Sequence, residues 1–328
     1  MKDKIIDILK DNQDNFVSGQ RISEMFNVSR AAIWKNINSL KEKGYVIESV
    51  SRKGYRLTST PDLLTHQEIK RYLKTKKIEF KIINYTSIES TNIKAKELAS
   101  DGLEEGTVII AEEQTSGKGR LGRSWTSPKS KGIWMSLILR PNISPLQASK
   151  TTQIAAAAVC KSIDELGIKA YIKWPNDIII NNKKVCGILT EISAELNRVN
   201  YIVIGIGINA NIDEKEFPQE IKDKATSLKI AYNKEVNRKE LTARILNNFE
   251  ELYLELIDNN TIKKSIEICK ESSILLGKKI RIIHTDRQNL AIAVDLTDQG
   301  ELLVKNENGE IEKIISGEIS VRGVNGYV

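Results

Sequence analysis

Residues 113–125, EQTSGKGRLGRSW, combine glycine with cationic side chains directly after a strand-like run, Thr107 to Ala111. Its glycines are Gly117, Gly119 and Gly122, and its cations are Lys118, Arg120 and Arg123. Glycine lets a backbone turn its N–H groups toward a phosphate or carboxylate at close range, and Lys and Arg supply charge. The segment, named here the glycine loop, therefore predicts a binding site for an anionic ligand. The alternative is a solvated surface loop rich in charge.

The same glycines match the dinucleotide-binding pattern GxGxxG, but their context does not. A dinucleotide loop opens a helix and is followed about 20 residues later by an acidic residue at a second strand end. Here Ser124-Trp125-Thr126-Ser127-Pro128 follows instead. We reject that interpretation.

Ser90-Thr91-Asn92 lies between a strand-like run, Lys81 to Tyr85, and a helix expected over Ile93 to Ala99. Taken alone, such a triplet is the cap of the helix. Together with Gln114 it could instead recognise a neutral polar head group through short hydrogen-bonding side chains.

Two further segments carry polar residues beside strands. In Lys173-Trp174-Pro175-Asn176-Asp177, the proline excludes regular pairing, so we expect a bend that exposes Asn176 and Asp177, or a plain structural turn. In KKVCGILTE, Lys184 opens a strand in which Gly187 permits a close approach.

The strand Tyr201 to Ile208 carries Gly205 and Gly207 on one pleat face and ends before Asn209. These glycines predict a slot for an apolar ligand body or a flat ring, with close helix packing as the alternative.

The amino-terminal 60 residues predict a winged helix-turn-helix. Ser18 and Ser29 are placed to cap two helices, the second of which runs from Arg30 to Lys43 with Ile33, Ile37 and Leu40 toward the core. Two strands, Tyr45 to Ser49 and Gly54 to Leu57, then form a basic hairpin through residues 50–53. The residues expected to meet DNA are Gly19, Ser29, Arg30, Ala31, Lys35, Asn38, Arg52 and Lys53. The alternative is a three-helix module for protein contacts.

Composition narrows the class of protein. The chain has 328 residues, 40% hydrophobic and 28% charged, with a net charge of +7 that fits a polyanionic partner. It has no apolar run of 18 residues and no signal peptide, so we expect a cytoplasmic protein without membrane contact. Cys160, Cys186 and Cys269 are expected to be buried free thiols. With His66 and His284 the only histidines, a histidine metal cluster or a Ser-His-Asp triad is not expected.

The pattern of elements is α+β, and we expect three domains. Residues 1–62 form the DNA-binding domain, with a linker over Thr58 to Asp62; residues 63–272 alternate helices and strands; residues 273–328 form a small all-β barrel with turns at 298–300 and 307–309.

In order along the chain, SGKGRLGRSW, KWPND, KVCGILTE, GIGIN and SGEISVR follow a winged helix. This combination closely resembles the bifunctional biotin protein ligases that also repress the biotin operon, over essentially the whole chain. The resemblance implies a central domain of the class II synthetase and lipoate ligase type and a carboxy-terminal SH3-like barrel. The family loop usually reads GRGRxGR, so Lys118 replaces an arginine; its charge survives, but a bidentate fork is lost.

The resemblance also implies roles for individual residues. Biotin would be bound by Ser90, Thr91, Asn92, Gln114, Gly117, Lys118, Gly119, Arg120, Lys184 and Gly187. ATP or the adenylate would be bound by Arg120, Arg123, Trp125, Asn176, Asp177, Lys184, Asn209 and Arg322. Catalysis would depend on Lys184, Arg120 and Asp177, with Asp177 as the base for the acceptor lysine or as a group that only orients ligands.

The implied substrates are biotin and ATP, with Mg²⁺ carried on the triphosphate, since the sequence shows no carboxylate cage for a metal. The implied partners are a biotin carboxyl carrier protein, operator DNA, and a second copy of the chain once biotinyl-AMP is bound. Residues 209–228 are expected to close over the adenylate. Two alternatives remain open: a ligase for another acid such as lipoate, and a non-catalytic repressor that senses a small acid.

Overall fold

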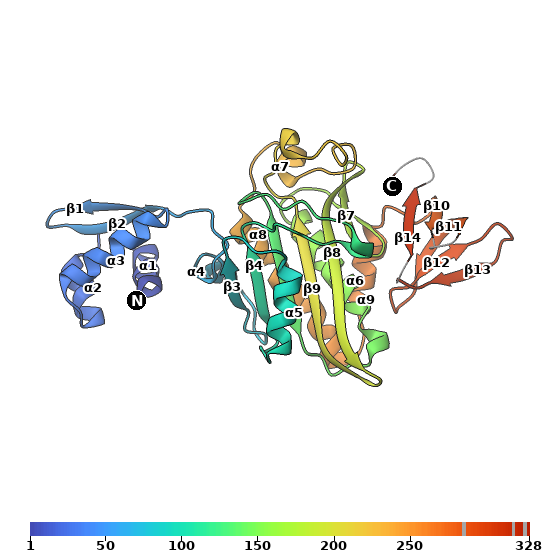
Figure 1. Ribbon diagram of the computed structural model, residues 1–328, viewed down its shortest axis with the longest axis horizontal. Coiled ribbons are helices and arrows are strands. Elements are labelled where there is room, and N and C mark those ends of the chain that lie inside the picture. Colours follow the sequence, from blue (N-terminus) through green and yellow to red (C-terminus); the bar gives the residue numbers. More distant parts are fainter. Residues whose placement is uncertain (284–286, 317–318, 324–326) are drawn as a thin grey trace. The chain divides into compact units, whose positions relative to one another are not determined.

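Three short helices and a hairpin form the first unit of the chain, Met1–Leu63, in the computed structural model. The structure describes residues 1–283, 287–316, 319–323 and 327–328. The helices are α1 (Lys2–Asp11), α2 (Gly19–Phe26) and α3 (Arg30–Glu42), and the hairpin strands are β1 (Val46–Val50) and β2 (Gly54–Ser59) (Figure 1). Burial of Ile22, Ile33, Ile37 and Leu40 confirms the apolar face expected for the helix pair.

The expected helix caps are present. The Ser18 side chain accepts from the Arg21 N–H, and the Ser29 side chain accepts from the Ala32 N–H, so each satisfies a donor that the helix start leaves unpaired. The linker prediction needs one correction. Thr58 and Ser59 belong to β2, where Ser59 pairs with Val46, because the strand continues past the last buried residue of the hairpin.

The second unit, Leu64–Val328, is built on a seven-stranded sheet. Its strand order is β3 (Lys81–Tyr85), β4 (Thr107–Ala111), β5 (Ile133–Leu139), β9 (Arg198–Ile208), β8 (Lys183–Glu195), β7 (Asp177–Ile180) and β6 (Tyr171–Lys173). Only β3 and β4 are parallel, and α5 (Thr91–Ser100) makes the crossover between them. The helix start therefore lies beside the end of β4, where the glycine loop begins.

The two faces of the sheet are covered by different helices (Figure 1). Alternate residues such as Ile109, Ile138 and Val203 pack against α5. The opposite face packs on α6 (Lys150–Asp164) and α8 (Arg238–Asn259), with α9 (Lys263–Glu271) beside α6. Short helical segments complete the unit: α4 (His66–Ile69), η1 (Lys70–Tyr72), η2 (Arg120–Gly122), η3 (Pro145–Gln147), η4 (Glu214–Glu216) and α7 (Leu228–Tyr232).

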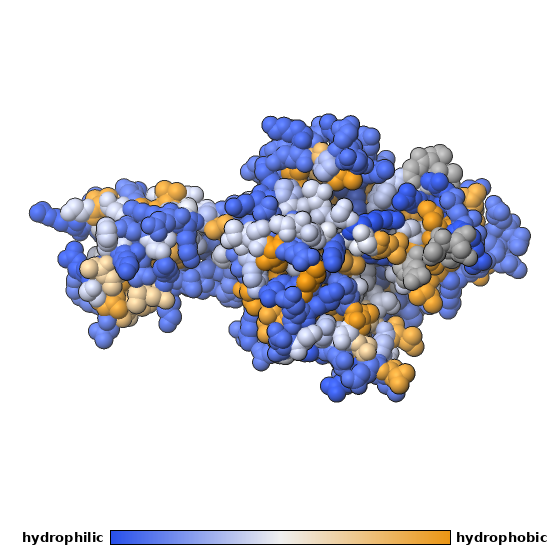
Figure 2. Space-filling model, viewed as in Figure 1, coloured by the Kyte–Doolittle hydropathy of each residue, from blue (hydrophilic) through white to orange (hydrophobic). Residues whose placement is uncertain are grey.

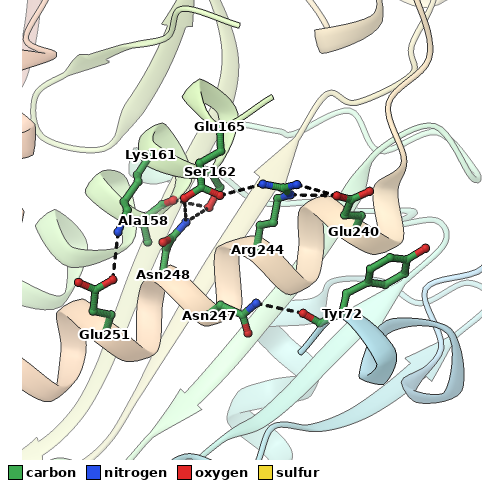
Figure 3. A network of polar contacts seen from close by, with 10 residues as sticks. All are labelled: Tyr72, Ala158, Lys161, Ser162, Glu165, Glu240, Arg244, Asn247, Asn248 and Glu251. Atoms are coloured by element: carbon green, nitrogen blue, oxygen red, sulfur yellow. Dashed lines mark hydrogen bonds and ion pairs between the residues drawn. The ribbon is translucent and has the colours of Figure 1, made fainter. Parts of the chain in front are cut away.

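Polar contacts join α6 to α8 (Figure 3). Asn248 Nδ2 donates to Ser162 Oγ at 2.8 Å and to Glu165 Oε1 at 3.1 Å, and Arg244 bridges Glu165 and Glu240. Asn248 is buried, so these partners remove the cost of taking its amide out of water. These contacts fix α6 and α8 relative to each other on one face of the sheet.

The carboxy-terminal residues form a five-stranded antiparallel sheet in the order β13 (Ile311–Ile314), β12 (Leu302–Lys305), β11 (Gln288–Leu296), β10 (Lys279–Ile283) and β14 (Ser320–Gly323). The expected turns join β11 to β12 and β12 to β13. Among the described residues β13 and β14 are not paired, so the barrel is open there. The sheet contacts the KWPND segment through the Trp174 Nε1–H, which donates to the Gly300 carbonyl at 2.9 Å.

No helix of the described chain is long and apolar enough to cross a membrane. On the face seen in Figure 2, apolar residues form separate patches among hydrophilic ones. Cys160, Cys186 and Cys269 are free and buried, which confirms that expectation.

Candidate functional site

The glycine loop leaves β4 and folds back on itself. The Gly119 N–H donates to the Arg123 carbonyl at 2.7 Å, and the Trp125 N–H donates to the Gly117 carbonyl at 2.8 Å. A Cβ at Gly117 would lie 2.4 Å from the Trp125 carbonyl oxygen, so no other residue fits there without a shift of the backbone. These bonds place the side chains of Arg120, Arg123 and Trp125 over the edge of the sheet.

The double-glycine floor under this loop is formed by Gly187 and Gly207, which are register partners on β8 and β9. A Cβ at Gly207 would lie 2.6 Å from Trp125 Nε1, and one at Gly187 would lie 3.1 Å from Trp125 Cζ3. A Cβ at Gly205 would lie 2.0 Å from Asn92 Oδ1. The slot expected over Gly205 and Gly207 is occupied by side chains of the protein itself. Asn92 of α5 lies against Gly205, which is the close helix packing given as the alternative, and Trp125 of the glycine loop lies against Gly207.

A small cavity opens beside this floor and brings together the polar residues expected to recognise a head group. Its lining includes Ser90, Thr91, Asn92, Gln114, Lys118, Gly119, Arg120, Trp125, Asn176, Lys184 and Gly187. The helix α5 begins at Thr91, two residues earlier than expected. Ser90 occupies the cap position, but its side chain makes no capping bond.

A hydrogen-bond network fixes the orientation of the amides in this cavity. Gln114 Oε1 accepts from the Thr91 N–H at 2.8 Å, so its Nε2 donates to Ser127 Oγ at 2.8 Å. Asn92 Nδ2 donates to Glu191 Oε2 at 2.8 Å, and Asn92 Oδ1 accepts from Ser136 Oγ at 2.6 Å. The amide groups that line the cavity are therefore held in fixed orientations.

Sequence reasoning overlooked Ser136 and Glu191. Ser136 is fully buried in the apolar strand β5, IWMSLIL. A single hydroxyl in such a strand is a usable signal, because a buried hydroxyl needs a partner. Glu191 lies on β8 and also pairs with Lys96 at 2.6 Å.

A larger cleft adjoins the cavity on the side of the carboxy-terminal sheet, and it is strongly cationic. The charged residues that line it are Arg120, Arg123, Lys173, Lys184, Lys224, Arg322 and one carboxylate, Asp177. Trp125, Asn176, Asn209, Phe217 and Tyr327 also line it. Such a charge balance suits a polyphosphate.

Arg120 stands between the two cavities. Its Nη1 donates to Asn176 Oδ1 at 2.9 Å, and its Nη2 donates to the Ile319 carbonyl at 3.1 Å. Burial lowers the pKa of Arg120, while Asp177 raises it and Arg123 lowers it. The guanidinium remains charged, since its ordinary pKa is above 12.

The KWPND segment departs from its prediction in one respect. Lys173 ends β6 and Asp177 starts β7, so the residues between them form the turn of an antiparallel hairpin. Asn176 and Asp177 are buried, not exposed, because the turn is covered by the glycine loop and by Tyr327. Asn176 Nδ2 also donates to the Ile188 carbonyl at 2.8 Å.

Asp177 is surrounded by donors. Lys184 Nζ lies 2.5 Å from its Oδ1, and the Tyr327 hydroxyl donates to its Oδ2. Burial alone would raise the pKa of Asp177, but the charges of Lys184 and Lys173 and the hydrogen bonds from Lys184 and Tyr327 hold that pKa below its ordinary value. Asp177 is therefore an ionised carboxylate at neutral pH.

Sequence reasoning assigned no role to Lys173 and did not mention Tyr327. Burial lowers the pKa of Lys173 to about 7, with Asp177 opposing this effect and Lys184, Arg322 and Arg123 adding to it. The Lys173 Nζ lies 3.4 Å from the centre of the Tyr327 ring. The first lysine of KWPND was a visible signal, whereas nothing near Tyr327 in the sequence points to the cleft.

The segment over residues 209–228 forms one wall of the cleft. It is bound to the start of β8: the Lys184 N–H donates to the Lys224 carbonyl at 2.8 Å, and the Thr226 N–H donates to the Lys184 carbonyl at 2.9 Å. Asn209 is buried and donates to the Thr226 carbonyl, so its amide supports this wall in addition to lining the cleft.

In the first unit, most of the residues expected to meet DNA lie on the exposed side of α3 and at the hairpin tip, with Ser29 exposed at the cap of α3. Gly19 instead opens α2 and is only partly exposed, because it packs against Tyr55. Arg30, Ala31 and Lys35 are exposed, Asn38 is partly exposed, and Arg52 and Lys53 are exposed in the turn. Trp34 was overlooked; it is 60% exposed on the same helix face, one turn beyond Arg30.

Among the residues that the structure describes, no group of three His, Cys, Asp or Glu side chains could hold a metal ion. Gly317 and Glu318, in the motif SGEISVR, and His284 lie outside the described residues.

Family models match three parts of the chain: an HTH domain over residues 2–56, the biotin/lipoate A/B protein ligase family over 84–209, and the biotin protein ligase C-terminal domain over 275–322. The chain is 40% identical to the bifunctional ligase/repressor BirA of Bacillus subtilis, with 98% of each chain covered. It is 28% identical to BirA of Escherichia coli, over 97% of this chain and 96% of that one. The biotin protein ligase of Aquifex aeolicus in complex with biotin and ATP has a similar structure, with a TM-score of 0.65, 31% identity, and coverage of 74% of this chain and 98% of that chain.

Proposed function

The chain belongs to the family of bifunctional biotin protein ligases and repressors, and we propose that its two adjoining cavities divide the biotin and nucleotide portions of the reaction between them. The protein is an ATP-dependent biotin protein ligase. It forms biotinyl-AMP and transfers biotin to a lysine of a carrier protein, and its winged helix makes it a repressor of biotin genes.

The observation that carries the assignment of the site is the position of Lys184 where the two cavities meet. Biotin would lie in the small cavity with its ring toward Thr91, Asn92 and Gln114 and its carboxylate at Lys184. The triphosphate would lie in the cationic cleft. A ligand ring could lie above Gly187 and Gly207 only if the Trp125 side chain moved away or packed beside it.

In the first half-reaction a biotin carboxylate oxygen attacks the α-phosphorus of ATP, and pyrophosphate leaves. The carboxylate is already ionised, so no base is needed. The obstacle is repulsion between two anions, which preorganised cations offset. Arg120, Arg123 and Lys184 supply that field, and Arg322 extends it from β14. Mg²⁺ bound to the triphosphate would neutralise further charge when present, and Asp177 is the carboxylate that lines this cleft.

In the second half-reaction the ε-amine of the acceptor lysine attacks the acyl carbon, and AMP leaves with the anhydride oxygen. The amine must lose a proton, since an ordinary lysine is mostly ammonium at neutral pH. Asp177, ionised and at the acyl side of the cleft, would draw in the ammonium group and orient it. Its lowered pKa makes Asp177 a better orienting group than a base, so the proton of the ammonium group would pass to solvent before the neutral amine attacks, and the proton released on amide formation would follow it.

The repressor function would respond to the adenylate through dimerisation. One winged helix contacts few base pairs, whereas a two-fold pair reads two half-sites. The adenylate can promote pairing only by binding the dimer-competent state more tightly, and the glycine loop and residues 209–228 are the elements that it would order. Sedimentation with and without biotin and ATP tests this; a chain that binds a palindromic operator equally well as a monomer in both conditions would contradict it.

The site is tested by a matched pair of lysines. Lys184→Ala should reduce biotinyl-AMP formation at least about 100-fold, which corresponds to about 2.7 kcal/mol of transition-state stabilisation. Lys183→Ala should be mild, because Lys183 Nζ only donates to the Lys222 carbonyl at the surface side of the strand. Equal losses of biotinyl-AMP formation in the two variants would show that Lys184 is not part of the site. Pyrophosphate release with a panel of acids, including lipoate, tests the choice of acid in the same assay.

A further inference from the structure

Tyr327 joins the carboxy-terminal sheet to the reaction site through two contacts. Its hydroxyl donates to Asp177 Oδ2, and its ring centre lies 3.4 Å from the Lys173 Nζ. It lines the same cleft as Arg322, Asp177 and Lys184. A single side chain from beyond β14 therefore contacts both ionisable residues of the KWPND hairpin.

Two side chains, Lys184 and Tyr327, bind the carboxylate of Asp177, and the substrate would compete with Asp177 for Lys184. Lys184 Nζ lies 2.5 Å from Asp177 Oδ1. In the proposed function Lys184 binds the biotin carboxylate first and the acyl phosphate afterwards. The Oδ1 side of Asp177 then becomes available to an incoming ammonium group, and its Oδ2 side is still held by Tyr327.

We propose that Tyr327 is a positioning residue for biotin transfer, which keeps Asp177 oriented toward the acceptor lysine while Lys184 is engaged by the adenylate. The inference rests on the proposed function and deepens it. It assigns to the carboxy-terminal part of the chain a role in the second half-reaction, in addition to the contact of Arg322 with the nucleotide.

The chemistry of the contact favours this role. Burial and the charge of Asp177 raise the pKa of Tyr327, so its hydroxyl remains a donor throughout the physiological range. A hydrogen bond to the ionised carboxylate stabilises that form. Four groups face Asp177: Lys184 from β8, Lys173 from β6, Arg120 from the glycine loop, and Tyr327 from beyond β14. Tyr327 stays uncharged throughout the physiological range, so it binds the carboxylate without attracting the negative charge of the substrate.

The test separates the two half-reactions in Tyr327→Phe, which keeps the ring over Lys173 and removes only the hydroxyl. Biotinyl-AMP formation from biotin and ATP should stay within about threefold of the natural protein. Single-turnover transfer from preformed biotinyl-AMP to a biotin carboxyl carrier domain should slow at least tenfold. The acid limb of the transfer rate should move to higher pH, because the pKa of Asp177 rises when it loses a hydrogen bond to its charged form.

The matched control is Tyr171→Phe. Tyr171 lies on β6 with Lys173 but is exposed outside the cleft, so both half-reactions should be unchanged. Thermal melts establish that each variant is folded. Unchanged transfer in Tyr327→Phe, or equal slowing of both half-reactions with the acid limb in place, would overturn the proposal. A natural protein that formed no biotinyl-AMP would instead refute the proposed function.

Discussion

Lys173 is a buried cation whose removal should stabilise the protein. The residue is 4% exposed, and its pKa lies at about 7 against an ordinary value of 10.5. At 1.36 kcal/mol for each pH unit, keeping this amine protonated in the folded state costs about 5 kcal/mol. The attraction of the Tyr327 ring for the ammonium group is one contribution to this net cost. Lys173→Met, which keeps the apolar stem, should therefore raise the free energy of unfolding by several kcal/mol, up to about 5 kcal/mol, below pH 7.

The pH dependence of the free energy of unfolding tests whether the buried charge of Lys173 causes the difference in stability. Between pH 7 and 10.5 the unfolded chain binds the proton of Lys173 more tightly than the folded protein does, so the stability of the natural protein rises with pH across that window. The variant lacks this contribution. Its advantage should be full below pH 7, shrink above it, and be nearly gone as pH approaches 10.5.

Urea unfolding followed by tryptophan fluorescence at pH 6.5 and pH 9.5 measures both quantities. Lys169→Met is the matched control, because Lys169 is exposed and its change should stay within about 0.5 kcal/mol at either pH. A Lys173→Met protein that is less stable at pH 6.5, or whose advantage does not change with pH, would refute the reasoning. The gain in stability should come with weaker binding of ATP, as is common when a strained charge is removed from a site.

Three other changes test the arrangement of the site and the domains. Gly207→Ala places a Cβ 2.6 Å from Trp125 Nε1, so biotinyl-AMP formation should fall at least tenfold. Gly119→Ala should have a milder effect, because the nearest atom to its Cβ would lie 3.5 Å away. A larger loss in Gly119→Ala than in Gly207→Ala would contradict the packing of Trp125 against Gly207. Hydrogen exchange over residues 117–123 should slow when biotin and ATP are added, and unchanged exchange would argue against loop closure. Removal of residues 1–62 should abolish operator binding in a gel-shift assay and leave biotin transfer measurable; lost catalysis in a folded protein would show that the first unit supports the active site.

Local patterns in the sequence sufficed for the winged helix. Ser18 and Ser29 cap helices and Ile33 and Ile37 face the core because these preferences act within one or two turns of chain. The motifs of the glycine loop, KWPND and Lys184 were likewise visible as local groups. The structure brings them together, because β4 ends and β8 begins at the same side of the sheet, and Asp177 at the start of β7 pairs with Gly187 of β8.

Only the tertiary structure decided what those motifs contact. Ser136 reaches Asn92 across 44 residues, and Tyr327 reaches Asp177 across 150, so no periodicity or spacing could reveal either pair. Burial of Asn176 and Asp177 depends on which segments cover the hairpin, and the floor of Gly187 and Gly207 depends on strand register. The types of the chemical groups follow from the sequence, whereas their partners, their burial and therefore their pKa values follow from long-range packing, which brings distant groups into a shared environment of low dielectric.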